Sequence, residues 1–269
     1  MGAQVAFENI IYEVSDRVAT ITLNRPDALN ATTDGLYSEL QGLIPQIADD
    51  QDVGAVIITG AGRGFCAGAD LKSRKADATP LERRKRHRWI LKDIIEPLIR
   101  LEKPVIAAVN GVAAGAGCSI ALAADYVIAS DKASFVQSFV RIGLVPDLAG
   151  LYMLARVIGV PRAKELCFTA RKVSAEEALS LGMVNYVVPH DELMAKAQAM
   201  AGDIAKGPPT SLAMIKTLLN KSLDSSLDQM LEFEGYAQTI AYITPEHEEG
   251  VAAFKEKRDP EFAKVARSK

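Results

Sequence analysis

The chain of 269 residues is 49% hydrophobic and 24% charged, and its formal net charge is −3. This composition excludes a disordered or fibrous protein, and the slight negative charge gives no general attraction to nucleic acid or to an anionic membrane. The three cysteines are widely spaced and form no CxxC pair, which indicates a reducing compartment. No apolar stretch approaches the roughly 18 residues of a membrane span, so we expect a cytoplasmic globular protein.

The first elements along the chain are a hairpin and a helix. Residues 7–14 and 18–23 alternate between apolar and polar side chains on either side of a short turn, which predicts two paired strands. Thr32 or Thr33 is a suitable N-cap for the following helix, which we expect to run to about residue 48.

The middle of the chain repeats one pattern. Short apolar runs over 55–59, 105–109 and 126–129 predict buried strands, and small-residue loops over 60–68 and 110–117 follow the first two. The second loop leads into a helix predicted over 118–124. Repetition of strand, loop and helix predicts an α/β domain with buried strands.

The C-terminal part is predicted to be helical. Helices over 191–206, 209–223, 226–243 and 245–257 begin with capping residues or first-turn prolines. We therefore divide the chain into an α/β core over 1–200 and a helical C-terminal subdomain over 201–269. Apolar positions such as Leu212, Ile215 and Leu219 exceed what one core can cover, which favours packing against another subunit.

Motifs of several other enzyme classes are missing from the sequence. The loop at 60–64 reads GAGRG, but Phe65 or Ala67 occupies the place of the third glycine of GxGxxG. The sequence holds no GxSxG and no His or Cys spacing typical of a zinc site, so we expect neither a serine hydrolase nor a metal. The basic run at 83–88 is compatible with a solvated helix face, with phosphate contacts or, more weakly, with RNA binding.

Four segments together resemble a known family. They are 64–71 (GFCAGADL), 103–118 (KPVIAAVNGVAAGAGC), 142–147 (IGLVPD) and 181–185 (LGMVN). In order and spacing they resemble the crotonase superfamily of enoyl-CoA hydratases and isomerases, from 21–26 to 254–260. The resemblance implies a crotonase-type core of repeated ββα units with a helical C-terminal subdomain, assembled as a homotrimer or hexamer. Coenzyme A would enter as the thioester substrate, and no separate cofactor is expected.

The resemblance also implies the roles of particular residues. Enolate chemistry on a thioester requires hydrogen-bond donors aimed at the carbonyl oxygen, and small-residue loops let a backbone approach a ligand closely. By resemblance, the backbone N–H groups of Cys66 and Ala116 form this oxyanion hole. Expected contacts to CoA come from the following residues: Arg25 for the phosphates, Ala67, Ala69, Asp70 and Leu71 around the adenine, and Phe254 and Lys257 near the C-terminus.

The sequence departs from the hydratase pattern at two positions. Ser119 and Phe139 stand where hydratases have two glutamates, so they would line the acyl pocket without supplying a carboxylate base. Asp147 is a carboxylate in an apolar segment nearby. It is either the N-cap of a helix starting near Leu148 or a catalytic base.

A single base could take a proton from one carbon and return it at another, which is double-bond isomerisation. Asp147 and the segment 247–258 resemble acyl-CoA isomerases of the phenylacetate pathway. Asp147 also resembles the nucleophile of aryl-CoA dehalogenases, for which His87 is the one candidate partner. We rank isomerase first, a hydratase with a non-standard acid/base set second and a dehalogenase-like hydrolase third. A non-catalytic CoA- or RNA-binding scaffold is the alternative from another class.

Overall fold

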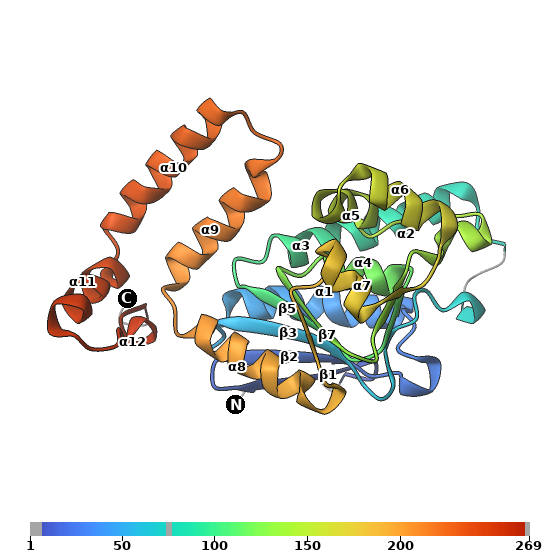
Figure 1. The fold of residues 1–269 in the computed structure, drawn as a ribbon, viewed down its shortest axis with the longest axis horizontal. Helices are drawn as coiled ribbons and strands as arrows, with labels where there is room; N and C mark the ends of the chain where they lie inside the picture. Colours follow the sequence, from blue (N-terminus) through green and yellow to red (C-terminus); the bar gives the residue numbers. More distant parts are fainter. Residues whose placement is uncertain (1–6, 74–76, 267–269) are drawn as a thin grey trace.

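The computed structural model describes residues 7–73 and 77–266. Figure 1 shows an α/β core and a helical arm that extends from one side of it. No helix in these described ranges is long and apolar enough to cross a membrane.

A six-stranded sheet forms the centre of the core. Its strand order is β1-β2-β3-β5-β7-β10, and all neighbours except the antiparallel pair β1 and β2 run parallel. The strands are β1 (Ile10–Ser15), β2 (Val18–Leu23), β3 (Ala55–Gly60), β5 (Val105–Val109), β7 (Tyr126–Ser130) and β10 (Tyr186–Val188). The structure thus confirms the hairpin and the three buried strands predicted from the apolar runs.

A second, four-stranded sheet has the order β4-β6-β8-β9. Its strands are β4 (Gly64–Cys66), β6 (Val112–Ala114), β8 (Ser134–Val136) and β9 (Val173–Ser174). Successive strand pairs β3–β4, β5–β6 and β7–β8 each contribute one strand to each sheet. The sequence did not predict β4 and β6, because each is three residues long and lies within a small-residue segment that resembles a loop.

Helices cover both faces of the large sheet. Alternate residues of β3 point to opposite faces, as the two-residue period of a strand requires. Ile57 packs with α8 (Leu193–Ala205), whereas Ile58 packs in the main core with α1 (Asp34–Asp49) and α4 (Ala116–Leu122). As predicted, Thr33 caps α1, where its side chain accepts the Leu36 N–H at 3.2 Å.

Further helices complete the core. They are α2 (Pro80–Ile90), a π-helical turn (Leu91–Ile95), α3 (Glu96–Ile99), α5 (Gly150–Ile158), α6 (Val160–Thr169) and α7 (Ala175–Leu181). Short 3₁₀ turns lie at Pro26–Ala28, Leu71–Ser73, Ser138–Ile142 and His190–Glu192.

The arm consists of α9 (Pro209–Ser222), α10 (Leu227–Tyr242), α11 (Pro245–Glu256) and α12 (Phe262–Ala266). The four predicted C-terminal helices are confirmed as α8 to α11, and α12 lies beyond them. The predicted boundary at residue 200 falls inside α8, which packs on the sheet (Figure 1).

A mostly buried ion pair joins α9 to the core. Lys216 Nζ lies 2.7 Å from Asp125 Oδ2 and donates to the Lys103 carbonyl oxygen at 3.1 Å, while the Val105 N–H donates to the same carboxylate. Burial raises the pKa of Asp125 and lowers that of Lys216, because it disfavours the charged form of each. The pair therefore stabilises α9 against the start of β5 only while both partners are present.

The first prediction concerns this pair. Lys216→Met leaves the Asp125 charge without its partner, so we expect the free energy of unfolding to fall by about 3 kcal/mol at neutral pH, the low end for such a loss. Asp125 keeps 22% of its side chain exposed, which favours the low end. The deficit should shrink as the pH falls through the raised pKa of Asp125, since protonation removes the unpaired charge. Urea denaturation across pH measures this, and the exposed Lys221→Met on the same helix is the control. A deficit that is absent at neutral pH or independent of pH contradicts the prediction.

The second prediction concerns assembly. None of the residues of α10, all of which the structure describes, is buried. Leu227, Leu231, Tyr236 and Ile240 are each at least half exposed. Apolar patches of this kind mark protein interfaces, so we expect a trimer-based oligomer with the arm at subunit contacts. Sedimentation velocity at micromolar concentration tests this, and a stable monomer would contradict it.

Candidate active site

The loop after β4 and the start of α4 lie against each other. A Cβ on Gly117 would come within 2.0 Å of the Cys66 carbonyl oxygen, so only glycine permits the contact. Gly68 has a φ of 99°, and a Cβ there would lie 2.8 Å from the Ala114 carbonyl oxygen and 3.7 Å from the Ala116 nitrogen. The two small-residue loops of the sequence therefore form one site.

A cavity opens beside this contact. It is lined by residues of α1, the loop after β4, α2, the π-helical turn, α4, the 3₁₀ turn at Ser138–Ile142 and the segment before α5: Tyr37, Ala69, Arg86, His87, Ile90, Leu91, Ala116, Phe139, Asp147 and Leu148. The structure thus brings together four of the predicted site residues, which are Ala69, Ala116, Phe139 and Asp147. Of the described residues that line this cavity, Asp147 is the one carboxylate.

Asp147 precedes a strained turn. Leu148 and Ala149 have φ values of 52° and 62°, a left-handed conformation that costs energy in residues with a Cβ. The helix α5 begins only at Gly150, its N-cap is Ala149, and no side chain caps it. Asp147 is therefore not the N-cap residue of this helix, contrary to that alternative. The Asp147 carbonyl oxygen accepts the Gly150 N–H at 2.8 Å, and the carboxylate lines the cavity.

His87 faces Asp147 across the cavity. Its Nε2 lies 3.5 Å from Asp147 Oδ2, and its Nδ1 lies 3.0 Å from the Arg83 carbonyl oxygen one turn earlier in α2. The side chains of His87 and Asp147 are 44% and 26% exposed, so the pair stands at the mouth of the cavity. Two members of the basic run, Arg86 and His87, line the cavity, whereas Arg84, Lys85 and Arg88 form an exposed helix face.

Two backbone N–H groups border the cavity. Ala116 is the first residue of α4, where the helix does not use the N–H. Ala69 forms a parallel bridge with Thr32, in which the Thr32 N–H donates to Gly68 at 2.8 Å and the Asp70 N–H donates to Thr32 at 3.0 Å. In such a bridge the N–H of Ala69 points away from Thr32.

Cys66, the other predicted donor, lies outside this cavity lining. It ends β4 and is completely buried, and burial raises the pKa of its thiol to about 12. The geometry therefore favours Ala69 over Cys66 as the neighbour of Ala116 in an oxyanion hole. The sequence could not reveal this choice, because it depends on the pairing of Ala69 with Thr32.

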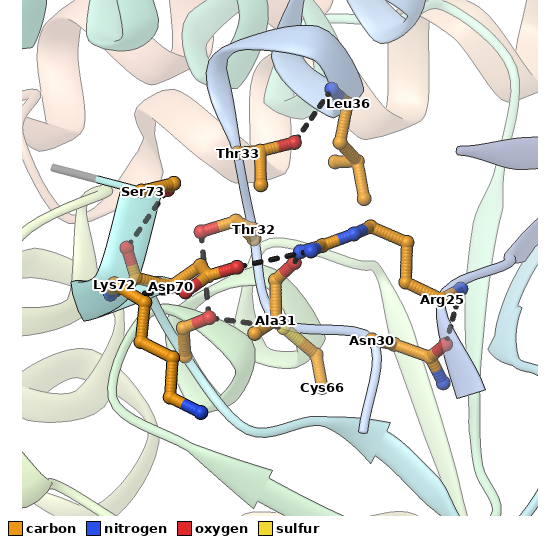
Figure 2. A network of polar contacts seen from close by, with 11 residues as sticks. Arg25, Asn30, Ala31, Thr32, Thr33, Leu36, Cys66, Asp70, Lys72 and Ser73 are labelled. Carbon is orange, nitrogen blue, oxygen red and sulfur yellow. Dashed lines mark hydrogen bonds and ion pairs between the residues drawn. The ribbon is translucent and has the colours of Figure 1, made fainter. Parts of the chain in front are cut away.

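Arg25 and Asp70, both predicted to contact CoA, bind each other. Figure 2 shows the Arg25 guanidinium between the Asp70 carboxylate, at 2.9 Å, and the Ala31 carbonyl oxygen. The hydrogen bond from Arg25 holds the pKa of Asp70 below its usual value. The pair fixes the loop that follows β4. The Ala67 N–H is used in a 2.9 Å bond to Leu29, and Leu71 is exposed.

Phe254 and Lys257 lie at the end of α11 in the arm. Phe254 is 85% exposed, and Figure 1 places α11 at the opposite end of the molecule from α2. A single protomer therefore does not bring these two residues together with Arg25 and Asp70. Their contact with CoA remains a prediction that requires a second copy of the chain.

Neither position of the missing glutamates carries an acid. Phe139 lines the cavity, and Ser119 is buried one turn after Ala116. Among the described residues the Ser119 hydroxyl has no hydrogen-bond partner, and it lies against Gly150, where a Cβ would come within 2.4 Å of its Oγ.

Sequence reasoning missed several cavity residues, among them Tyr37, Ile90 and Leu91. Tyr37 lies on the buried side of α1 and donates to Thr32 Oγ1 at 3.1 Å, and burial raises its pKa, so it remains protonated. Leu91 begins the π-helical turn. The apolar stripe of α1 could have indicated Tyr37, but no sequence signal marks a π-helical turn.

Comparison with known proteins agrees with this geometry. A family model described as enoyl-CoA hydratase/isomerase matches residues 13–265. The chain is 40% identical over 263 residues to the 1,2-epoxyphenylacetyl-CoA isomerase of Escherichia coli, covering 95% of this chain and 98% of that protein. It is also 40% identical over 251 residues to the short-chain-enoyl-CoA hydratase of Clostridium acetobutylicum, covering 93% and 95%.

A solved structure of an enoyl-CoA hydratase/isomerase from Cupriavidus metallidurans superposes with a TM-score of 0.90 at 36% identity, covering 96% of this chain and 97% of that one. The sequence resemblance to the crotonase superfamily and the expected core of ββα repeats are both confirmed. The chain belongs to the enoyl-CoA hydratase/isomerase family of the crotonase superfamily.

Proposed function

We propose that the protein is an acyl-CoA double-bond isomerase that shifts a proton between C2 and C4 of its substrate. Asp147 takes a proton from one carbon, and the electron pair of the broken C–H bond enters the conjugated thioester to form an enolate. Asp147 then returns the proton at the other carbon. The double bond moves, no water is consumed, and the carboxylate is regenerated.

One observation carries this proposal. Asp147 is the one carboxylate among the described residues lining the cavity that contains Ala116. Hydration requires activation of water by one group and delivery of a proton to carbon, which two positioned acid–base groups accomplish best. Ser119 and Phe139 provide neither, whereas a 1,3-proton shift requires only one base that reaches both carbons.

The enolate oxygen would be held by the backbone. We place it between the N–H groups of Ala116 and Ala69, with Ala69 in place of the Cys66 predicted from the sequence. The partial positive charge at the start of α4 supports the Ala116 donor, and the pairing of Ala69 with Thr32 leaves its N–H available. Two such donors act on charge that develops during the reaction, so they lower its barrier.

The CoA moiety would follow the loop at residues 67–71, beside the Arg25–Asp70 pair. Phe254 and Lys257 would come from the arm of a neighbouring copy, because the arm of the same chain points away (Figure 1). The acyl-CoA thioester is thus the substrate, in a homotrimer or hexamer.

The relatives leave a second candidate. The Escherichia coli relative is named an isomerase, whereas the Clostridium acetobutylicum relative and others are named hydratases. A hydratase with an unusual acid/base set is therefore second. A hydrolase with Asp147 as nucleophile is third, and the histidine beside Asp147 favours it. Assays with a panel of unsaturated and ring-containing acyl-CoAs, scored for shifted double bonds, hydrated products and free CoA, separate the three.

The third prediction tests the base. Asp147→Asn keeps the size of the side chain but removes its basicity, so isomerisation should fall by about 10²–10⁴-fold, the usual contribution of a positioned acid–base group. Thermal stability and CoA affinity should change little, because asparagine keeps the size and one oxygen of the side chain and Asp147 lies outside the CoA loop. Asp191→Asn, at an exposed 3₁₀ turn, is the control. Turnover by Asp147→Asn at close to the parent rate would refute the mechanism.

The fourth prediction tests the oxyanion hole. Ala116→Pro deletes the donor N–H at the first helical position, where proline is tolerated. Turnover should fall by about 10²–10³-fold, the cost of one lost donor. Val160→Pro is a matched control, because Val160 also begins a helix after a glycine of positive φ, Gly159, and is half exposed. If a folded, CoA-binding Ala116→Pro variant keeps full activity, Ala116 is not a donor.

A further inference from the structure

His87 stands between the catalytic cavity and the outside of the molecule. It lines the cavity that holds Asp147, and together with Arg86 it also lines a wider groove between α1 and α2. With 44% of its side chain exposed, it has access to solvent while its Nε2 faces Asp147 Oδ2 at 3.5 Å. A proton on Asp147 therefore has a titratable neighbour on the path to water.

The second ring nitrogen defines the role of the first. Nδ1 lies 3.0 Å from the Arg83 carbonyl oxygen, which can only accept a hydrogen bond. We therefore assign the hydrogen of the neutral ring to Nδ1. This tautomer leaves the lone pair of Nε2 directed at Asp147.

Several charged and polar side chains surround His87. Two cations, Arg83 and Arg86, precede His87 on α2. Arg86 binds Asp34 of α1 at 2.5 Å, and Glu82 lies at the outer groove, so two carboxylates partly offset them. Tyr37 faces the cavity from α1 as a protonated phenol.

When the ring is neutral and Asp147 is ionised, the pair consists of a carboxylate and a ring nitrogen lone pair, which are both acceptors. Their 3.5 Å separation is longer than a good hydrogen bond. Once Asp147 takes a proton from substrate it becomes a donor, and Nε2 can accept. The pair can therefore form a hydrogen bond in the state in which the enolate exists.

We propose that His87 is a proton-relay residue, which accepts from Asp147 the proton removed from substrate and exchanges it with solvent through the outer groove. The proposal rests on the role of Asp147 in the proposed function. The Asp147 O–H bond breaks, the Nε2–H bond forms, and the ring becomes an imidazolium hydrogen-bonded to the carboxylate. The imidazolium then gives Asp147 a proton, which is either the one it received or one it exchanged with solvent. This step restores the neutral ring, so charge and protons balance.

The test is the source of the hydrogen in the product. In D₂O, a 3-enoyl-CoA should isomerise on the parent enzyme with deuterium incorporated from solvent, measured by mass spectrometry in the first turnovers. His87→Gln cannot accept and release the proton, so its product should retain mainly the hydrogen of the substrate. Turnover should fall about tenfold, which is about 1.4 kcal/mol. A merely structural role for His87 would lower turnover without changing the deuterium content per product.

A matched control and a second measurement make the outcomes distinct. His190→Gln makes the same substitution at a histidine whose Nδ1 lies 3.0 Å from Ser130 Oγ, outside the catalytic cavity, and should match the parent in both readouts.

Deuterium exchange at C2 of saturated butanoyl-CoA requires enolate formation but no isomerisation, and His87→Gln should slow it. If the parent fails to isomerise but exchanges C2 in a His87-dependent way, the isomerase proposal fails and the relay stands. Equal deuterium content in the parent and His87→Gln products, with equal C2 exchange, overturns the relay.

Discussion

The site depends on one steric constraint, the direct contact between two stretches of backbone. Gly117 at the start of α4 lies so close to the Cys66 carbonyl oxygen that any Cβ would collide with it, and Gly68 approaches Ala114 in the same way. This contact sets the distance between Ala69 and Ala116, and thereby between the two backbone N–H groups proposed to bind the enolate. A side chain at either glycine would separate them, and no other residue could restore the geometry.

The sequence predicted those features that depend on local pattern. Apolar runs identified β3, β5 and β7, and the Thr33 cap identified the start of α1. The strands β4 and β6 could not be predicted, because three residues carry too little periodicity to distinguish a strand from a loop. The second proposed oxyanion donor likewise could not be identified from local sequence pattern. Whether Cys66 or Ala69 presents its N–H depends on a bridge to Thr32, which lies 37 positions away from Ala69.

Residue type alone also failed to show which charges are already paired. Arg25 and Asp70 were each predicted to contact CoA, and in the structure they bind each other (Figure 2). This pairing gives them a structural task, which is to hold the loop after β4 in place, and any contact with phosphate must use the remaining N–H groups of Arg25. For Phe254 and Lys257 the difficulty is different, because sequence resemblance assigns a residue to a site without saying which subunit supplies it.

Two features that lower local stability lie beside the cavity that contains Asp147. Leu148 and Ala149 adopt left-handed conformations without being glycine, at about 1–3 kcal/mol each. Ser119, one turn after Ala116, buries a hydroxyl that has no partner among the described residues. Both features bear on Asp147, since the strained turn directs its carboxylate into the cavity and Ser119 packs against the same turn at Gly150. The strain therefore lies directly beside the carboxylate that we propose as the base.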